Sequence, residues 1–417
     1  MRLLYSAGIS LYHAAVRCSA LWNPKARAWV EGRRELFQRL EGKRAELNGC
    51  LWMHCASVGE FEQGRPVLEA IKSVRPELPV LLTFFSPSGF NMHKDSALAD
   101  HVDYLPADSV ANAAQLVELI APRACLFVKY EFWYHHLHAL KAKNVPVFLV
   151  SAIFRKDQPF FTWFGGAWRK MLGCSTHIFT QDEASCQLLA AISITNVSVS
   201  GDTRFDRVRT IVDANEELET AKAFCAASKS LVVVCGSTWP KDEQMILSAL
   251  EKGKIRPRLI VAPHELSAEH LGAIEARFPK PLITWTEATA ASNSISSFPI
   301  DTLLVDGMGM LARLYKYADI VYVGGGFGDG IHSVLEAAAW GKPVIFGPHH
   351  RKFPEAQGLI DVGAGFEVKN AEELHAVLDR LLEDPVALRK ASEGARRYVR
   401  ERVGAAVAVA DRVLARI

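Results

Sequence analysis

Residues 321–348 read VYVGGGFGDGIHSVLEAAAWGKPVIFGP. An apolar run at 320–325 leads into a glycine-rich turn, a helix-length segment follows, and a second apolar run occupies 343–347. Continuous apolar runs are typical of strands that are covered on both faces, and helices that join such strands are typical of parallel sheets. The stretch therefore predicts one strand–helix–strand unit of an α/β fold.

The same alternation recurs along the chain from residue 50 onward. The runs lie at 50–56, 79–85, 124–130, 146–153, 177–182, 197–202, 231–237, 258–263, 302–306, 320–325, 343–347 and 363–368. Their order predicts two doubly wound, Rossmann-like halves, with a boundary between 201 and 229 where a polar stretch rich in Ala and Glu begins. Residues 286–300 predict a polar loop within the second half.

Length and composition agree with this organisation. A chain of 417 residues favours two or three domains, and its 49% hydrophobic and 23% charged residues are typical of a soluble globular protein. The net charge of +2 gives no indication of nucleic acid as a partner. The eight cysteines form no C-x-x-C pair, which predicts reduced core residues of a cytosolic protein.

The N-terminal segment differs from the rest. Residues 3–16 are apolar, but Arg17 ends this run well short of the roughly 20 residues of a membrane span. Residues 1–48 hold nine Lys and Arg against four Glu, a net +5. We predict that 1–48 lies on an anionic membrane surface, with packing on its own domain as the alternative. A signal peptide is disfavoured because no small-residue cleavage site follows.

These patterns predict three parts of the chain. Residues 1–48 form the membrane-surface segment, and residues 49–210 and 211–417 form the two Rossmann-like domains. The last helix is expected within 385–417 and is a candidate for packing back on the first domain.

Glu60 raises the first question about function. The stretch HCASVGEFEQGRP, residues 54–66, places it just after a predicted strand, where ligands of parallel sheets collect. Ser57 and Glu60 also match the S-x-x-E capping box, in which each side chain bonds the other residue's backbone N–H. The spacing alone favours the cap, and the alternative is a catalytic base at the rim of a cleft.

The second half contains a candidate phosphate site. Residues Gly236, Ser237 and Thr238 follow a predicted strand, with Pro240 in the first turn of a helix. A hydroxyl N-cap with free backbone donors suits a phosphate. His264 stands at the next strand tip.

The glycine-rich loop is the second candidate. Its glycines at 324, 325, 326, 328 and 330 allow the backbone to approach a ligand closely. The spacing satisfies neither G-x-G-x-x-G nor the Walker motif, which argues against a dinucleotide or P-loop site. Ser333 and Glu336 repeat the S-x-x-E pattern, and a phosphate and ribose pocket and plain capping are equally compatible with it.

Six motifs carry a resemblance to a known family. HCASVGE, VKYEFW, GDTRFDRV, GSTWPKDE, HSVLEAAAWGKPVIFGP and FPEA, in this order, resemble the Kdo transferases of lipopolysaccharide synthesis, over nearly the whole chain. The resemblance implies the GT-B fold, with two Rossmann-like domains facing across a cleft. It implies transfer of 3-deoxy-D-manno-octulosonic acid (Kdo) from CMP-Kdo to the lipid A precursor lipid IVA, without cofactor or metal. The implied location is the cytoplasmic face of the bacterial inner membrane.

The resemblance implies that residues 49–210 bind the acceptor and that residues 211–417 bind the CMP-sugar. It also implies roles for single residues. Glu60 would be the general base, and the acceptor side would comprise Ser57, Gly59, Glu131, Arg155 and Lys156, of which the last two would hold lipid A phosphates or merely form a solvated loop. The donor side would comprise Gly236, Ser237, Thr238, Pro263, His264, Gly309, Met310, Leu311, Gly330, His332, Ser333 and Glu336.

Four positions depart from the family pattern. His264 stands where an arginine is usual, Ser333 where an asparagine is usual, Met310 where an acid is common, and Tyr134 where a proline is usual. A neutral imidazole holds an anionic leaving group less well than a guanidinium does. Compensating cations are expected at Lys241, Arg351 or Lys352.

Other functions remain as alternatives. The cluster His135, His136 and His138 lacks a completing carboxylate or cysteine, so a metal site is disfavoured. Another GT-B enzyme, acting on a UDP-sugar, is the main rival. A non-catalytic protein of the membrane surface that binds a nucleotide or glycolipid is the rival of a different class.

Overall fold

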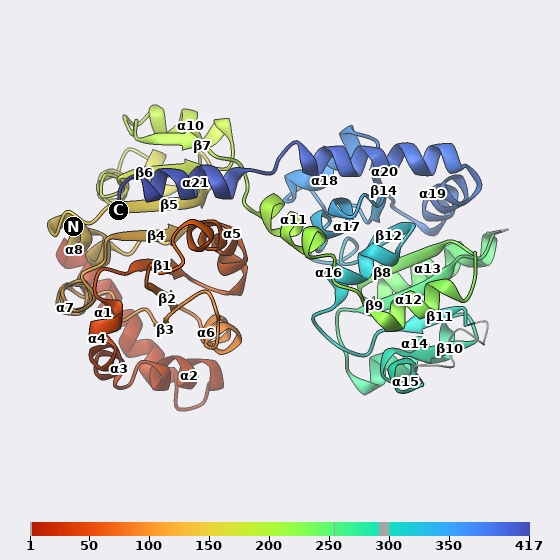
Figure 1. The fold of residues 1–417 in the computed structure, drawn as a ribbon, viewed down its shortest axis with the longest axis horizontal. Helices are drawn as coiled ribbons and strands as arrows, with labels where there is room; N and C mark the ends of the chain where they lie inside the picture. Colours follow the sequence, from red (N-terminus) through yellow and green to blue (C-terminus); the bar gives the residue numbers. More distant parts are fainter. Residues whose placement is uncertain (1, 254, 292–299) are drawn as a thin grey trace. The chain divides into compact units, whose positions relative to one another are not determined.

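The structure, a computed structural model, describes residues 2–253, 255–291 and 300–417. The chain divides into two compact units, which we describe separately (Figure 1). The first comprises Met1–Arg207 and Val403–Ile417, and the second comprises Val208–Arg402. The chain thus passes twice between the units.

The first unit is built on a parallel sheet of seven strands. In chain order the strands are β1 Leu51–Cys55, β2 Val80–Phe84, β3 His101–Tyr104, β4 Ala124–Val128, β5 Val147–Ala152, β6 His177–Thr180 and β7 Val197–Val199. The spatial order is β3-β2-β1-β4-β5-β6-β7, so the strand order reverses between β1 and β4. Such a reversal opens a crevice at the carboxyl ends of the two strands.

Helices cover both faces of this sheet. They are α1 Arg2–Ser19, α2 Pro24–Gly32, α3 Leu36–Gly42, α4 Arg44–Leu47, α5 Val58–Val74, α6 Pro87–His93, α7 Val110–Ile120, α8 Tyr134–Ala142, α9 Gly166–Leu172, α10 Glu183–Ala190 and α21 Ala405–Leu414, with α11 Arg204–Ala214 at the junction. Neighbouring residues of β1 enter different cores: Trp52 belongs to one and Met53 to the other. The continuous apolar run therefore reflects burial on both faces.

The second unit repeats the plan. Its strands are β8 Val232–Thr238, β9 Arg258–Pro263, β10 Leu282–Thr284, β11 Thr302–Leu304, β12 Ile320–Val323, β13 Val344–Phe346 and β14 Gly365–Glu367. Its helices are α12 Glu219–Ala226, α13 Pro240–Lys252, α14 Ala268–Arg277, α15 Trp285–Ala290, α16 Leu311–Leu314, α17 Leu335–Ala339, α18 Pro354–Asp361, α19 Ala371–Glu383 and α20 Pro385–Arg400. The order β10-β11-β9-β8-β12-β13-β14 reverses between β8 and β12.

The α/β prediction with two parallel sheets is confirmed, and each predicted run contains a strand. Two strands were missed, and both lie at a sheet edge. Strand β3 reads HVDY and β10 reads LIT, which are too short or too polar for an apolar run. The predicted loop at 286–300 is partly wrong, because Thr284 and Glu287 form a true capping box for α15; residues 292–299 lie outside the described part.

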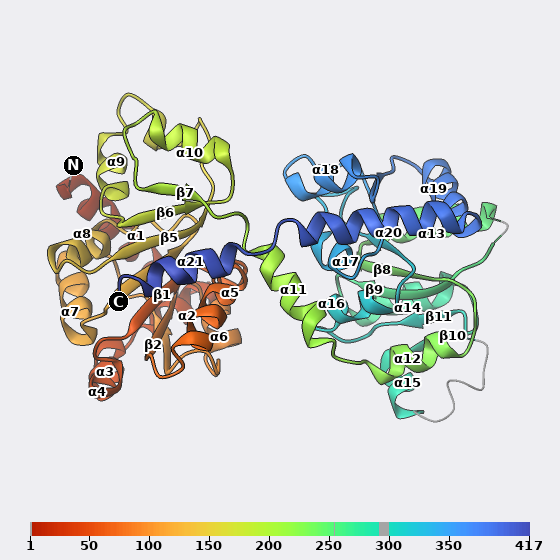
Figure 2. The same ribbon diagram turned by 45° about the horizontal axis from the view of Figure 1, so that its top comes forward.

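Helix α21 belongs to the core of the first unit. Its Ala406, Val409, Ala410 and Val413 pack in the same core as β1 and α5, and Figures 1 and 2 show α21 lying beside α5. The Asp206 carboxylate accepts hydrogen bonds from the N–H groups of Gly404 (2.7 Å) and Ala406 (3.2 Å), so it caps the first turn of α21.

His177 links the stability of this packing to pH. Burial lowers the pKa of His177 to about 4, and the charges of Arg412 and Arg416 on α21 lower it further. A folded-state pKa below the ordinary value means that acid favours the unfolded chain, which takes up the proton first. We expect stability to fall as the pH drops from 6.5 toward about 4, by at most about 1.4 kcal/mol per pH unit from this group.

Thermal unfolding across this pH range measures the effect. His177→Gln should flatten the curve of melting temperature against pH, whereas His375→Gln, a change to a partly exposed histidine of α19, should leave the curve unchanged. Equal curves for the wild type and His177→Gln would contradict the assignment.

The N-terminal helices attach to the first unit. Helix α2 packs on α6, whereas α3 and α4 pack on α7. Helix α1 packs on α2, and the Tyr5 hydroxyl donates to Asp108 at 2.6 Å. Leu3, Leu4 and Leu11 of α1 are 84%, 75% and 73% exposed. Within the described residues, no helix combines the length and the apolar character that crossing a bilayer demands.

Candidate active site

Glu60 lies just beyond the carboxyl end of β1, in the first turn of α5. Ser57 is the N-cap residue of α5, but its side chain bonds no backbone N–H of the helix. Its hydroxyl donates instead to the Glu60 carboxylate. The capping-box prediction is therefore wrong here. Because Glu60 lies in the first turn of α5, the helix dipole favours its negative charge by about 0.3–1 kcal/mol.

Glu131 lies beyond the neighbouring strand, β4. Its carboxylate accepts hydrogen bonds from His54 Nε2 (3.1 Å) and Trp133 Nε1 (2.6 Å), and its side chain is 12% exposed. His54, at 0% exposure, contacts Thr83 through Nδ1 (2.9 Å), so the ring is held from both sides. This chain of partners fixes the Glu131 carboxylate at the β1/β4 reversal.

The charges of Glu60 and Glu131 both affect the pKa of Cys55. Burial raises the pKa of the Cys55 thiol well above its usual value, and the charges of Glu60 and Glu131 raise it further. Cys55 is the last residue of β1. The sheet thus places both predicted carboxylates at one crevice.

Arg155 joins this group from β5. Burial raises the pKa of the Tyr130 phenol, while the charge of Arg155 lowers it and the charges of Glu60 and Asp182 raise it. Arg155 and Lys156 are both exposed. The charges that act on Tyr130 thus come from residues that follow β1, β5 and β6.

The contacts of Glu131 lead to a prediction. Glu131→Gln replaces one acceptor oxygen by an NH₂ group, so either the His54 or the Trp133 N–H faces a donor. We expect about a tenfold loss of catalytic turnover with an unchanged fold, because one charge-assisted hydrogen bond of roughly 1.5 kcal/mol is lost. Steady-state kinetics, with circular dichroism as the check on folding, measure it; full turnover would contradict a functional role for Glu131.

In the second unit, Gly236, Ser237 and Thr238 are the last residues of β8. A Cβ at Gly236 would overlap the Tyr315 hydroxyl, and one at Gly324 would overlap the carbonyl oxygen of Ser237. Two glycines thus bring the end of β8 against the glycine-rich loop. The β8/β12 reversal lies at this point, which makes it the crevice of the second sheet.

The predicted hydroxyl N-cap of α13 is wrong. Thr238 is buried and its hydroxyl donates to Glu243 at 3.1 Å. The N-cap residue is Trp239, whose backbone N–H donates to Asp242 at 3.0 Å. The sequence motif GSTWPKDE is indeed at the site, but its acid, and not its hydroxyl, caps the turn.

Asp242 organises the whole turn, and sequence reasoning missed it. Its buried carboxylate also accepts hydrogen bonds from the Tyr322 hydroxyl (2.8 Å) and the Gly325 N–H (2.9 Å). It therefore ties α13, β12 and the glycine-rich loop together. The available signal was an acid in the first turn of a helix that follows a buried strand.

Three rings stack beside this turn. His264 lies between Trp239 (ring centroids 4.6 Å apart) and His332 (4.5 Å), with 25° between planes in both pairs. The Trp239 indole N–H donates to His332 Nε2 at 3.3 Å, and burial, followed by His264, lowers the pKa of His332. His332 is therefore a neutral imidazole, with Nδ1 left as its possible donor.

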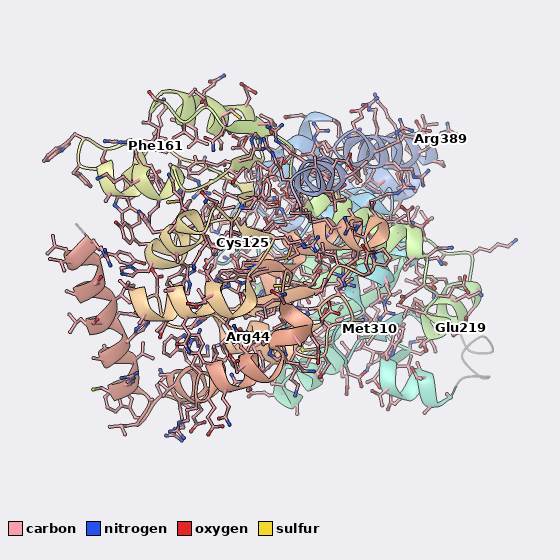
Figure 3. All side chains as sticks on the ribbon, turned by 60° about the vertical axis from the view of Figure 1, so that its left-hand side comes forward. Arg44, Cys125, Phe161, Glu219, Met310 and Arg389 are labelled. Atoms are coloured by element: carbon pink, nitrogen blue, oxygen red, sulfur yellow. The ribbon has the colours of Figure 1, made fainter. Side chains whose placement is uncertain are left out.

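The remaining predicted donor residues line the same end of the sheet. Met310, labelled in Figure 3, is the N-cap residue of α16, after Gly309 at φ +85°, and Leu311 lies against Gly236. The Glu336 charge adds to the burial that raises the pKa of Tyr315.

The structure also places the last predicted residues. Pro263 ends β9, and the N–H of His264 donates to the Thr238 carbonyl at 2.9 Å. Gly330, at φ +143°, packs on Phe353. Ser333 is exposed and precedes Val334, the N-cap residue of α17, so the second predicted capping box is also wrong.

The histidines of α8 have protein partners. His135 Nε2 contacts Ser6 Oγ (2.9 Å), His136 Nε2 contacts the Pro106 carbonyl (3.2 Å), and His138 Nδ1 contacts the Tyr134 carbonyl (2.7 Å). Across the described parts of the chain, no group of three His, Cys, Asp or Glu side chains is arranged to hold a metal ion.

Comparisons with known proteins bear on these sites. Residues 30–207 match the family described as 3-deoxy-D-manno-octulosonic-acid transferase (kdotransferase). A 3-deoxy-D-manno-octulosonic acid transferase of Bordetella pertussis is 26% identical over 424 residues, covering 95% of this chain and 97% of that protein. One from Aquifex aeolicus is 29% identical over 84% of this chain and 91% of that protein. The chain is a relative of the Kdo transferases. The resemblance predicted from the motifs is confirmed.

Solved structures confirm the GT-B fold of this Kdo transferase relative. A UDP-GlcNAc 2-epimerase from Neisseria meningitidis, 16% identical, covers 88% of this chain and 100% of its own with a TM-score of 0.59. MurG of Acinetobacter baumannii, 13% identical, covers 88% of this chain and 99% of its own with a TM-score of 0.55. At such identities the likeness concerns the fold alone.

Proposed function

We propose that this chain is an inverting glycosyltransferase that moves Kdo from CMP-Kdo to a lipid A precursor, lipid IVA. The observation that carries the proposal is the position of Glu60, a carboxylate in the first turn of the helix that follows β1, in a chain related to Kdo transferases along nearly its whole length. We place the reaction at the cytoplasmic face of the bacterial inner membrane, with α1 and the basic segment after it on the membrane surface.

Glu60 acts as the general base in this proposal. Its carboxylate takes the proton of an acceptor hydroxyl while the oxygen attacks the anomeric carbon of Kdo. A new C–O bond forms on the face opposite CMP, and the bond to the phosphate oxygen breaks with its electron pair staying on CMP. The Ser57 hydroxyl, which donates to Glu60, holds the carboxylate ready before the acceptor hydroxyl replaces it.

Arg155 and Lys156 serve the acceptor. Both are exposed beyond β5, and Arg155 is close enough to Tyr130 to affect its pKa together with Glu60. Phosphate groups of the lipid A precursor suit such cations. Glu131, fixed by His54 and Trp133, keeps the acceptor hydroxyl oriented.

The second unit holds the nucleotide. Backbone N–H groups of the β8 turn and the glycine-rich loop receive the CMP phosphate, and the Gly309–Leu311 segment faces the cytosine. His264 contributes as part of the stack with Trp239 and His332. Lys241, whose Nζ lies 5.7 Å from the Phe327 ring of the glycine-rich loop, is a candidate for the missing arginine charge, as are Arg351 and Lys352.

Ligand-induced stabilisation tests the donor. We expect CMP-Kdo to raise the melting temperature, because a ligand at 100 times its Kd stabilises the folded state by about 2.7 kcal/mol. UDP-sugars at the same concentration should leave it unchanged. Stabilisation by a UDP-sugar alone would favour the rival GT-B enzyme.

One assay tests the reaction. Purified protein is incubated with CMP-Kdo and the tetraacylated lipid A precursor, and the lipid is analysed by mass spectrometry. A product heavier by Kdo supports the proposal. Tight binding of both substrates without any product would support a non-catalytic binding protein instead.

A further inference from the structure

A cavity of about 360 Å³ lies in the first unit beneath helix α1. Its walls come from α1, α2, α3, the segment after β3 and the start of α7. The lining residues are His13, Arg17, Trp29, Val30, Arg33, Arg34, Leu36, Phe37, Pro106, Ala107 and Asn112. Its size is within the range of small-ligand sites, and none of the residues assigned above to acceptor or donor lines it.

The wall of this cavity is strongly basic. Arg17, Arg33 and Arg34 line it together with His13, and among the described lining residues there is no Asp or Glu. Burial lowers the pKa of His13, and the charges of Arg33 and Arg17 lower it further. The positive charges of the arginines thus favour the neutral form of His13.

Among the described residues, no carboxylate bonds the Arg33 guanidinium. Its guanidinium donates to the carbonyls of Phe85 (2.8 Å), Leu105 (2.9 Å) and Trp29 (3.1 Å), and it stacks on the Trp29 ring at 3.9 Å. Burial lowers its pKa to about 9, so it stays charged at neutral pH. Carbonyl dipoles and rings hold this charge without neutralising it.

The two acids whose charges act on Arg33 and His13 are engaged elsewhere. Asp103 accepts two hydrogen bonds from Arg39, at 2.7 and 3.0 Å. Asp108 accepts from the Tyr5 hydroxyl and from the backbone N–H groups of His135 and His136. Neither Asp103 nor Asp108 is a lining residue of the cavity.

Trp29 supplies an unused donor. Its side chain is only 8% exposed, and its indole Nε1 is enclosed without a hydrogen-bond partner among the described residues. A buried N–H without a partner costs free energy, so such groups usually have an explanation. Trp29 lines the cavity, so an acceptor bound there lies next to this ring.

The surroundings indicate what kind of ligand carries that acceptor. Arg17 belongs to α1, whose Leu3, Leu4 and Leu11 are largely exposed, and Figure 3 shows α1 at the margin of the first unit. On the inner side, Trp29 contacts Phe85, with ring centroids 5.8 Å apart, and Phe85 stacks on Trp133 at 5.1 Å. The cavity therefore lies between an exposed apolar helix and the residue that holds Glu131.

We propose that this cavity binds a phosphate monoester or diester carried by a lipid, with Arg17 and Arg34 as direct ligands and Arg33 as a fixed charge behind them. Guanidinium groups match phosphate geometry, and α1 would bring its apolar side to the acyl chains. The site goes beyond the proposed transfer reaction, and phosphate binding here does not depend on that reaction.

The indole N–H of Trp29 reports on the site. In a protein with ¹⁵N-labelled tryptophan, Trp29→Phe identifies its NMR signal by loss. Sodium phosphate and monomeric dihexanoyl-phosphatidylglycerol are titrated separately, against sodium chloride at equal ionic strength. We expect a saturable shift of the Trp29 signal with phosphate-bearing compounds and none with chloride.

Matched variants separate a built site from diffuse attraction. Arg17→Gln and Arg34→Gln, both at exposed side chains, should each weaken binding about tenfold. Lys25→Gln removes the same charge from an exposed position outside the cavity and should change binding less than about twofold. Tighter binding of the lipid than of inorganic phosphate identifies a headgroup site, and equal binding a site for phosphate in general.

Two results would overturn the proposal. One is an unmoved Trp29 signal in both titrations. The other is an equal loss of binding in Lys25→Gln and in the two cavity variants, since net charge alone would then explain the affinity.

Discussion

Replacing Glu60 with glutamine is expected to lower the turnover of Kdo transfer by about 100-fold to 10,000-fold, the usual contribution of a general base. Glutamine keeps the size of the side chain and can still accept a hydrogen bond from the Ser57 hydroxyl, so α5 should start as before. Single-turnover kinetics with CMP-Kdo and the lipid A precursor measure the loss directly.

The control is a second carboxylate of the same helix. Glu69→Gln makes the identical chemical change further along α5, where Glu69 pairs with Arg65 at 2.8 Å. It should keep turnover within about twofold, because exposed ion pairs contribute little. Stabilisation by CMP-Kdo should be the same in both variants, and near-normal turnover of Glu60→Gln would end its assignment as the base.

The second large effect is expected at Asp242. Asp242→Ala leaves the Tyr322 hydroxyl and the N–H groups of Trp239 and Gly325 without their buried acceptor. Each buried donor without a partner costs about 1–3 kcal/mol, so the second unit should lose roughly 3 kcal/mol or more. Denaturant unfolding measures the loss, and CMP-Kdo binding should fall with it because the glycine-rich loop loses its anchor.

Tyr322→Phe distinguishes the hydrogen bond that Asp242 makes to the core from the one it makes to the glycine-rich loop. It removes only the hydroxyl and its hydrogen bond to Asp242, so it should cost about 1 kcal/mol and keep nucleotide binding. If Asp242→Ala unfolds at the same denaturant concentration as the wild type, Asp242 does not organise this turn.

The sequence predicts the interior of the two sheets well and their margins poorly. Central strands such as β1 are buried on both faces, and that burial demands a continuous apolar run. Edge strands have one neighbour fewer and tolerate polar residues, as the buried Asp103 of β3 illustrates by pairing with Arg39. Such a pair depends on contacts between distant residues, and no local pattern reveals it.

The candidate site shows the same division. Strand ends locate Glu60, Glu131, the β8 turn and the glycine-rich loop, because parallel sheets bring ligands to their carboxyl ends. The partners were not predictable. The S-x-x-E pattern does not reveal whether a serine hydroxyl bonds a backbone N–H or the carboxylate, and at Ser57 it bonds the carboxylate. His54, Trp133 and Asp242 act across the sheet, through contacts that exist only after folding.

Helix α21 has a consequence for how the protein is made. In chain order Val403–Ile417 follow the entire second unit, yet Val409 and Val413 fill the core around β1 and α5, which precede that unit. During synthesis the first unit therefore keeps an apolar groove exposed to solvent until the second unit has been translated. A gene truncated just after α20 would therefore leave the early half of the enzyme, and not the late half, incomplete and prone to aggregation.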